Sequence, residues 1–538
     1  MRINVYTYHL LYKKILTFAL MIIVFWACSK DNEPITPGTT FTRLLANEVI
    51  KSKILKREIN YAVLLPKNYG KTSDSFPVVY LLHGYGDNQS AWHKYGLIQY
   101  YSDLDVAQNG PMIFVMPQAF NTYYVNKYNG IYPYMDFFTT ELVPTIDSVY
   151  RTKKDKTQRA VMGFSMGGYG ALILPAVHPE LFSISVPLSM SFRTDEQYMA
   201  ESQTAFDNQW ASVFGGYGTE GINRLTDYFK EHSPFHFFNQ NDLSKFATLR
   251  ILLDCGDDEE SLSVTNGALH NLLKNRSIPH EFRVRNGGHS WDYWHKSLPE
   301  ALAFISHGFQ NLNYPENQEP VTVENQILPE QYQLEDLNGS NIQLGIFKPA
   351  DYDLNTSLYP GIFLLHGYKG GTRSENAKQI LSLLNDKMQT GKLPNSLIIE
   401  IPVSENEITA EIFTSVLNQI KTNYHLMDDN KGLVLMGNEN GGTTACSLID
   451  EFPDTFNGCF LFDANLTPDA TPTANQYYYV DASDKTNNPA GNYNFYLTLR
   501  NNGNDHEYRI HQGTPSLQST LNGINESINY LSKKLRNS

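Results

Sequence analysis

The chain repeats one pattern twice, and this repeat constrains the fold more than any other feature of its 538 residues. In the first copy, an apolar segment ending at Pro66 is followed by a turn-rich loop and by an apolar run that ends in His83-Gly-Tyr. In the second copy the same features end at Pro349 and in His366-Gly-Tyr, and each histidine follows its proline by 17 residues. The repeat predicts two similar domains in tandem.

Short apolar runs alternate with longer helical stretches in the first half. Because these runs are apolar on both faces, they are typical of strands in a sheet that helices cover on each side. The alternation favours right-handed βαβ units and a mostly parallel sheet, which is an α/β fold. The expected strands are residues 78–82, 112–116, 159–163, 184–188, 250–254 and 281–285.

Polar and turn-forming residues separate the halves at 309–322, which we interpret as a linker. We therefore expect one domain at 45–308 and a second at 323–538. The second is shorter because it lacks an insertion, at about 191–242, that we expect to cap the site of the first domain.

The N-terminus is typical of an exported protein. Basic residues precede an apolar run of 13 residues, 15–27, which suits a signal-peptide core and is shorter than a bilayer span. The run ends at Cys28, and this position resembles a bacterial lipoprotein signal, with Ser29 and the charges after it similar to export signals of surface lipoproteins in Bacteroidota. The resemblance implies a signal peptide at 1–27, a lipid anchor to the membrane on Cys28 and a tether at 28–44. We expect an exported lipoprotein of the outer membrane or cell surface; the alternative is an ordinary signal peptide with an incidental cysteine.

Charge and cysteine content exclude several classes of function. The 42 Lys and Arg residues against 56 Asp and Glu give a net charge of −14, and no basic block offers a nucleic-acid surface. Cys255, Cys446 and Cys459 are too far apart for a metal knuckle and too few for a disulfide scaffold. A bridge between Cys446 and Cys459 remains an alternative to two buried thiols.

A nucleophile motif stands between an apolar run and a helix of small residues. The string Gly163-Phe-Ser165-Met-Gly167 has the Gly-x-Ser-x-Gly pattern of a nucleophile elbow, in which glycines permit a cramped strand-to-helix turn that exposes the serine hydroxyl. The start of the following helix favours negative charge developing near Ser165. We expect Ser165 to be a catalytic nucleophile.

A serine nucleophile needs a base and an acid, which follow it in the chain in this class. His289 comes directly after a predicted strand and a glycine pair, and we expect it to be the general base. The acid is expected among the four carboxylates at 257–260, whereas Asp254 is expected to be structural.

Backbone N–H groups are expected to form an oxyanion hole. One comes from Met166, the residue after the nucleophile, and the other from the loop after the third strand, where Tyr85 is the natural donor. His83 is expected to organise this loop.

Seven strings of the first half belong together: His83-Gly84, Met116-Pro117, Glu141-Leu-Val-Pro144, Gly163-Phe-Ser165-Met-Gly-Gly-Tyr-Gly-Ala171, His178-Pro179-Glu-Leu-Phe182, Asp254-Cys-Gly256 and Gly287-Gly-His289-Ser-Trp291. Together these strings resemble the esterase D (putative esterase) family, which includes carbohydrate esterase family 1 with its feruloyl and acetylxylan esterases. The resemblance covers about residues 45–308 and implies an α/β-hydrolase fold with a Ser-His-Asp triad. The family's usual spacing gives Glu259 as the acid, but the loop is about one residue longer here, so Asp258 is preferred and Glu259 is the alternative.

The second half keeps the glycines of the motif and loses its chemistry. Aligned with the first half, Glu439 replaces the nucleophile, and pairing Gly513 with Gly288 places Thr514 at the base. The equivalent of the acid loop, 479–485, has no clear carboxylate in place. We expect a degenerate, non-catalytic binding or stabilising domain.

Tyrosines follow the second expected parallel strand, on the side where we expect the site. They could flank an acyl or sugar pocket or simply pack beneath the loop. They are Tyr123, Tyr124, Tyr128, Tyr132 and Tyr134. His232 and His236 do not form a metal pair because Pro234 disfavours the helix between them, so no metal or other cofactor is expected.

These features predict a serine esterase that acts through an acyl-enzyme and removes feruloyl or acetyl groups from polysaccharide at the cell envelope. Its partners would be an acylated glycan or a small ester, and the membrane. One alternative is a siderophore esterase or an acyltransferase of the same fold. An S-formylglutathione hydrolase is disfavoured by the signal peptide. An alternative of another class is a non-catalytic surface lipoprotein that binds glycans.

Overall fold

The computed structural model describes residues 43–104, 109–324, 326–354, 356–367, 372–403, 407–428, 432–467 and 469–536. From Leu45 to Ser538 the chain forms one compact unit. The predicted signal peptide, Cys28 and nearly all of the predicted tether lie outside the described residues. Among the helices of the described ranges, none has the length and apolar character that a membrane span requires.

The first half is built on a mostly parallel sheet, as the sequence predicts. Its strands lie in the order β1-β2-β4-β3-β5-β6-β7-β8; β2 is antiparallel to β4, and the neighbours from β4 to β8 are parallel. Each of the six strands expected from the sequence is present within about two residues. The strands are β1 (Leu44–Ser52), β2 (Arg57–Leu64), β3 (Val78–Leu82), β4 (Ile113–Pro117), β5 (Arg159–Phe164), β6 (Ile184–Leu188), β7 (Arg250–Gly256) and β8 (Glu281–Arg285).

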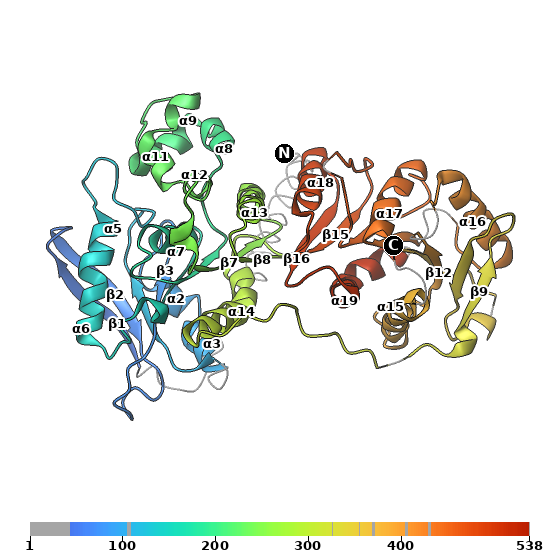
Figure 1. The fold of residues 1–538 in the computed structure, drawn as a ribbon, viewed down its shortest axis with the longest axis horizontal. Coiled ribbons are helices and arrows are strands. Elements are labelled where there is room, and N and C mark those ends of the chain that lie inside the picture. Colours follow the sequence, from blue (N-terminus) through green and yellow to red (C-terminus); the bar gives the residue numbers. More distant parts are fainter. Residues whose placement is uncertain are drawn as a thin grey trace, which may run out of the picture. The chain divides into compact units, whose positions relative to one another are not determined.

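The second half repeats this strand order. Counted from its outer edge, the order is β9-β10-β12-β11-β13-β14-β15-β16. This is the order of the first half with eight added to each strand number. The last strands of the two halves, β8 and β16, pair antiparallel, so all sixteen strands belong to one sheet (Figure 1). The added strands are β9 (Tyr332–Asp336), β10 (Gln343–Phe347), β11 (Gly361–His366), β12 (Leu397–Pro402), β13 (Leu433–Asn438), β14 (Cys459–Phe462), β15 (Tyr478–Ser483) and β16 (His506–His511). The division into two domains with a linker at 309–322 stays a prediction.

Helices cover the sheet, and the strands between them are buried along their whole length in β3 to β6 and β11 to β15. This burial explains why those strands are continuous apolar runs in the sequence. The main helices are α3 (Ile98–Leu104), α6 (Val143–Val149), α7 (Met166–Val177), α13 (Glu260–Asn275) and α14 (Trp291–Phe309) in the first half, and α15 (Thr372–Gln389), α16 (Ala410–Asn423), α17 (Asn440–Glu451), α18 (Pro489–Asn502) and α19 (Leu517–Leu535) in the second.

The insertion expected between β6 and β7 is a group of short helices that stands apart from the sheet (Figure 1). Buried aromatic rings join it to α7: Phe192 stacks on Tyr169 at 4.7 Å between ring centroids and on Phe229 at 5.5 Å. The hydroxyl of Tyr169 also donates to the carbonyl of His232 at 2.7 Å. The helices include α8 (Asp195–Ala200), α9 (Gln203–Ala205), α10 (Ser212–Phe214), α11 (Asp227–His232) and α12 (Pro234–Phe237).

Three cysteines lie within the described residues, and all are buried free thiols. They are Cys255, Cys446 and Cys459. The expectation of buried thiols is confirmed for Cys446 and Cys459, and the alternative bridge is wrong. Burial raises the pKa of each thiol, which keeps it protonated.

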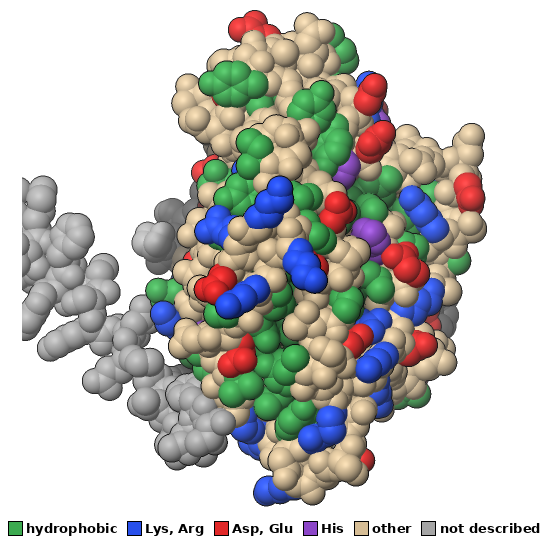
Figure 2. Space-filling model, turned by 90° about the vertical axis from the view of Figure 1, so that its left-hand side faces the viewer, with side chains coloured by type: hydrophobic (Ala, Val, Ile, Leu, Met, Phe, Trp, Pro, Cys, Tyr) green, Lys and Arg blue, Asp and Glu red, His purple; other side chains and the backbone are tan. Residues whose placement is uncertain are grey.

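The surface of the first half mixes charges of both signs. On the face shown in Figure 2, Lys and Arg side chains alternate with Asp and Glu, and hydrophobic side chains lie between them. This face shows no block of a single charge that would favour a polyanionic partner.

Candidate active site

Ser165 stands at a sharp turn between β5 and α7. Its backbone has φ 59° and ψ −122°, a conformation that residues other than glycine rarely adopt. Two hydrogen bonds hold this turn: the N–H of Ser165 donates to the carbonyl of Leu188 at 3.0 Å, and Ser191 donates to the carbonyl of Ser165 at 3.0 Å. Strain held by surrounding structure is typical of functional positions.

Two glycines allow the backbones at this turn to touch. A Cβ atom at Gly163 would lie 2.2 Å from the carbonyl oxygen of Gly167, and one at Gly167 would lie 2.2 Å from the carbonyl oxygen of Leu82. No side chain fits at either distance, so the first turn of α7 packs directly on β5 and β3. The Gly-x-Ser-x-Gly pattern is therefore a packing requirement of this turn.

His289 connects the serine to a carboxylate. The Oγ of Ser165 lies 2.9 Å from Nε2 of His289, and Nδ1 of His289 lies 2.7 Å from Oε2 of Glu259. With Nδ1–H donating to the carboxylate, Nε2 is free to accept the serine proton. Ser165 is half-buried and His289 is exposed, so a substrate in solution can reach both.

Glu259, the alternative given by the sequence, faces His289, and the preference for Asp258 is corrected. Asp258 is exposed, and its N–H donates to the carbonyl of Gly287 at 3.2 Å. Glu259 is buried and begins the turn into α13, so its side chain points inward, where its length reaches His289. The sequence shows only the length of the loop. Which side chain faces inward depends on how the loop packs, and the length does not determine that.

Residues that the sequence did not single out hold Glu259 in place. Its second carboxylate oxygen, Oε1, accepts from the hydroxyl of Ser189 at 2.5 Å and from the N–H of Gly256 at 2.8 Å. Ser189 in turn accepts from the indole N–H of Trp294 at 2.8 Å. The one available signal was that Ser189 directly follows a strand end, next to the expected site.

Asp254 has a structural role, as expected. Its carboxylate accepts from the hydroxyl of Tyr293 at 2.6 Å and of Ser297 at 2.7 Å, and it pairs with Arg285. These contacts tie β7 to β8 and α14 beneath the site.

The loop after β3 lies against the nucleophile. A Cβ atom at Gly84 would lie 3.5 Å from Cβ of Ser165, which places the neighbouring Tyr85 beside the site. His83 organises the loop as expected: its Nδ1 donates to the carbonyl of Gly84 at 2.8 Å, and its Nε2 accepts from the N–H of Ala119 at 2.9 Å. Burial lowers the pKa of His83 to about 4, so it is neutral. The oxyanion roles of Tyr85 and Met166 stay predictions.

The tyrosines after β4 divide between core and surface. Tyr123, Tyr124 and Tyr134 are fully buried, whereas Tyr132 is partly exposed and Tyr128 is 59% exposed. The hydroxyls of Tyr124 and Tyr134 donate to the carbonyls of His83 and Gln118, at 3.0 and 2.9 Å. Most of this set therefore supports the loops near the site from beneath.

His232 and His236 each contact another group of the insertion. Nε2 of His236 lies 2.9 Å from a carboxylate oxygen of Asp195, and Nδ1 of His232 contacts the carbonyl of Tyr228 at 2.8 Å. In the described ranges, no cluster of three or more potential ligands could hold a metal ion.

The second half keeps the sharp turn without the nucleophile. Glu439, between β13 and α17, has φ 49° and ψ −122°, close to the values at Ser165. Burial and the neighbouring Asp463 raise the pKa of Glu439. A carboxylate cannot take the part of the serine hydroxyl by the same route.

The alignment of the base loops is shifted by one residue from the prediction. Gly513 has φ 135°, which matches Gly287 at φ 142° and not Gly288. Pro515, and not Thr514, therefore stands at the position of His289. The shifted register also makes Arg509 the equivalent of Arg283.

A cation stands next to a buried aspartate at the same place in each half. His511 faces Asp481 at 2.9 Å, where the first half has Arg285 and Asp254. Burial by itself would lower the pKa of His511, but Asp481 and the neighbouring carboxylates raise it to about 9. The second half therefore keeps an ion pair at this place in the sheet, built from another cation.

Comparisons with known proteins relate the first half of the chain to esterases. Residues 52–305 match the family described as "Putative esterase". The first half of this chain is an esterase, and its sequence is similar to that family over these residues. The chain is 26% identical over 273 residues to an acetyl esterase of Caldicellulosiruptor saccharolyticus, a match that covers 47% of this chain and 95% of that protein.

Two further relatives carry feruloyl or ferulic acid esterase in their names. An endo-1,4-beta-xylanase/feruloyl esterase of Xylanibacter ruminicola is 29% identical over 181 residues, which are 31% of this chain and 24% of that protein. A solved ferulic acid esterase is 27% identical, with a TM-score of 0.42 over 49% of this chain and 98% of its own.

Replacing the two carboxylates of the acid loop separately tests the assignment of Glu259. We expect Glu259→Gln to lower kcat for a short-chain ester by about 10⁴-fold, since an amide does not hold His289 in the required tautomer or stabilise its charged form. The neighbouring change Asp258→Asn is the matched control and should leave kcat within about twofold. Steady-state kinetics of both variants decide the matter; an equal loss in both would mean that the loop as a whole, and not Glu259, is required.

A methyl group at the turn tests the packing argument. Gly167→Ala should lower the free energy of unfolding by about 1–3 kcal/mol or more, because its Cβ meets backbone that has no room to move. Gly70→Ala, where a Cβ atom meets nothing within 4 Å, is the control. Urea denaturation followed by circular dichroism measures both, and equal stability of the two variants would refute the argument.

Proposed function

We propose that this protein is a serine carboxylic ester hydrolase that acts through an acyl-enzyme and removes feruloyl or acetyl groups from polysaccharide. The observation that carries the mechanism is the continuous hydrogen-bonded path from Glu259 through His289 to Ser165. Such a path activates a hydroxyl that is otherwise a weak nucleophile. Ser165, His289 and Glu259 are the proposed nucleophile, general base and acid.

In the proposed reaction the Oγ of Ser165 attacks the ester carbonyl while its proton passes to Nε2 of His289. The charged imidazole is stabilised by Glu259, and it then gives the proton to the leaving alcohol as the carbonyl–oxygen bond breaks. A water molecule, deprotonated by His289, hydrolyses the acyl-serine and releases the acid. The N–H groups of Met166 and Tyr85 are the proposed donors to the negative oxygen of each tetrahedral intermediate.

The substrate class rests on the relatives and on the surface beside the nucleophile. The names of the acetyl esterase and of the xylanase/feruloyl esterase favour acetyl and feruloyl esters of plant polysaccharide. The ring of Tyr85 is 45% exposed beside the nucleophile turn, and it offers an aromatic face to a phenolic acid or a sugar.

The proposed location is the outer membrane or the cell surface. It rests on the sequence around Cys28 alone, whose pattern favours a lipid anchor. An anchored esterase would meet a polymer that does not enter the cell. Labelling of the expressed protein with a palmitate analogue, lost in Cys28→Ala, is the result that supports this proposal.

Removing the nucleophile tests the reaction type. We expect Ser165→Ala to lower the rate of p-nitrophenyl acetate hydrolysis by at least about 10³-fold, because no other group can form the acyl-enzyme. Ser148→Ala, which removes an exposed hydroxyl from α6, serves as the matched control. If wild type and Ser165→Ala hydrolyse the ester equally slowly, the esterase mechanism is wrong and a glycan-binding function takes its place.

A substrate panel tests the acyl group. We expect kcat/KM for methyl ferulate or acetylated xylan to exceed that for a catecholate trilactone by at least about tenfold, because the trilactone is a bulky ester of another class. In the same panel, Tyr85→Ala should lower kcat/KM for methyl ferulate more than for p-nitrophenyl acetate, since only the ferulate has a ring to stack. A trilactone that is hydrolysed fastest would instead assign the protein as a siderophore esterase.

A further inference from the structure

The two halves meet through matching parts of the duplicated fold. In the antiparallel pair of β8 and β16, Val284 lies opposite Ile510. These two residues occupy the same position in the two copies, by the register that Gly287 and Gly513 set. Equivalent residues that face each other across a joint are the mark of a two-fold axis, so the joint resembles the isologous interface of a dimer built within one chain.

Each half supplies an arginine to a buried aspartate of the other. Arg509 of β16 pairs with Asp257, and Arg283 of β8 donates to Asp484 at 2.6 Å. In each pair, the backbone N–H of the residue before the arginine donates to the same carboxylate oxygen. Tyr508 donates to Asp257 at 3.3 Å, and Phe282 donates to Asp484 at 3.2 Å. We call each of these arginine–aspartate pairs, with its backbone hydrogen bond, a clamp. The Arg509–Asp257 clamp and the Arg283–Asp484 clamp are equivalent in chemistry and position.

Only one of the two clamps reaches the catalytic loops. Asp257 lies two residues before Glu259, and its other carboxylate oxygen accepts from the N–H of Gly287, two residues before His289, at 3.2 Å. The N–H of Asp257 also donates to the carbonyl of Arg285 at 3.1 Å. Asp257 therefore joins the loop of the acid to the loop of the base. Asp484 makes the equivalent bond to Gly513 at 3.0 Å, in a half that has neither acid nor base.

Helix α18 of the second half adds further contacts at the same point. The guanidinium of Arg500 donates to the carbonyl of Asp257 at 3.3 Å, and the hydroxyl oxygen of Tyr496 lies at the same distance from that carbonyl. The proton of the Tyr496 hydroxyl is donated to the hydroxyl of Ser263 at 2.7 Å, in the first turn of α13. The segment that carries Glu259 is thus bound by the second half on both of its sides.

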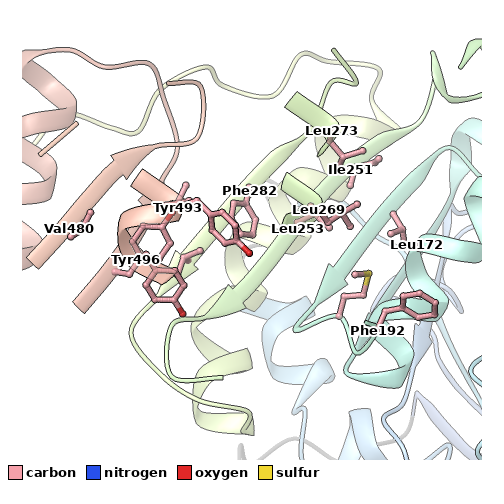
Figure 3. Packing of buried hydrophobic residues seen from close by; sticks show 14 of the residues in the cluster. Leu172, Phe192, Ile251, Leu253, Leu269, Leu273, Phe282, Val480, Tyr493 and Tyr496 are labelled. Atoms are coloured by element: carbon pink, nitrogen blue, oxygen red, sulfur yellow. The ribbon is translucent and has the colours of Figure 1, made fainter. Parts of the chain in front are cut away.

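Apolar packing fixes α18 against the first half. Figure 3 shows Tyr493 and Tyr496 beside the strands and helix that carry Phe282 and Leu269, and all four belong to one buried cluster. A Cβ atom at Gly267 would lie 2.5 Å from the ring of Tyr493, so ring and helix are in direct contact. The hydroxyl of Tyr493 donates to the carbonyl of Val264 at 2.7 Å.

The charge of Asp257 makes its pairing with Arg509 important for the position of the loops. The carboxylate is buried, and burial raises its pKa while Arg509 lowers it. Removing the arginine would leave a buried carboxylate without its cation, which is costly, so the loop would move or Asp257 would take up a proton. Either change weakens the hold on the loops of Glu259 and His289.

We propose that the second half serves as a positioning module for the active site of the first, and that Arg509 holds the acid and base loops in register through Asp257. This inference rests on the proposed function of the Ser165 site. Arg509 touches no reacting atom; it is a positioning residue. The duplication would thus have kept its second copy for the joint, after that copy lost the nucleophile and the base.

The test compares the two equivalent aspartates in the full-length protein. We expect Asp257→Asn and Arg509→Met to lower kcat for p-nitrophenyl acetate by about 10- to 100-fold with KM within about twofold, because loop displacement disturbs the proton path more than substrate contacts. Asp484→Asn breaks the equivalent clamp and is the matched control. It should destabilise the protein to thermal unfolding by a similar shift in Tm while kcat stays within about twofold of wild type.

The rate at which a fluorophosphonate modifies Ser165 gives a second readout. It should fall with kcat in Asp257→Asn and Arg509→Met and stay at the wild-type value in Asp484→Asn. Arg509→Lys, which restores the charge, should recover part of the rate. Circular dichroism at the assay temperature confirms that each variant is folded.

Three results would overturn the inference. They are a wild-type kcat in both Asp257→Asn and Arg509→Met, an equal loss of kcat in Asp484→Asn, and a change confined to KM. The first would mean that the loops of Glu259 and His289 keep their positions without the clamp. The second would mean that any damage to the joint lowers activity through lost stability alone. A comparison of wild type with Ser165→Ala in the same assay separates these outcomes from a failure of the proposed function, since that comparison does not involve the joint.

Discussion

The backbone contact at the turn between β5 and α7 is the constraint from which the site follows. Gly163 and Gly167 bring the start of the helix onto β5 and β3 at distances that admit no Cβ atom. The residue between them is forced to a positive φ, where its side chain leaves the packed layer. In the first half that residue is Ser165, and the turn places its hydroxyl within reach of a histidine from a loop 124 residues further along the chain.

The same turn is present in the second half, where Glu439 stands in place of the serine. Glu439 has nearly the same φ and ψ as Ser165, and Gly437 and Gly441 make equally close contacts: a Cβ atom at either would lie within 2.4 Å of a carbonyl oxygen. The glycines belong to the packing of strand and helix, so they are required even where chemistry is not. The side chains that do chemistry lie at loop positions that packing does not constrain, and there the two halves differ.

Carboxylates are buried near both the site and the joint, and two of them, Glu259 and Asp257, are held by several donors. Glu259 receives three donors and Asp257 receives donors from both halves. Buried carboxylates are costly when unpaired, so such networks tolerate few arrangements and hold their loops rigidly. Rigid donors and acceptors are what an activated nucleophile needs, because no reorganisation is then required during the reaction.

The self-complementary joint gives the duplication a structural meaning. Each half has a strand edge, an arginine and an aspartate, and each set fits the other because the two are copies. Pairing β8 with β16 also covers two sheet edges that would otherwise expose unpaired backbone groups.

The sequence by itself determined the repeat, the parallel sheet, the nucleophile turn and the pair Ser165 and His289. These features are local or periodic. Apolar runs indicate buried strands, glycines indicate close backbone contacts, and the order of serine and histidine in the chain indicates the class of triad. Tertiary structure decided which carboxylate faces His289, because the side-chain direction in a loop depends on what packs against it, and spacing alone favoured Asp258. It also decided the one-residue register of the base loops and the joint, since β8 and β16, Asp257 and Arg509 lie more than 200 residues apart and meet only when both halves are folded.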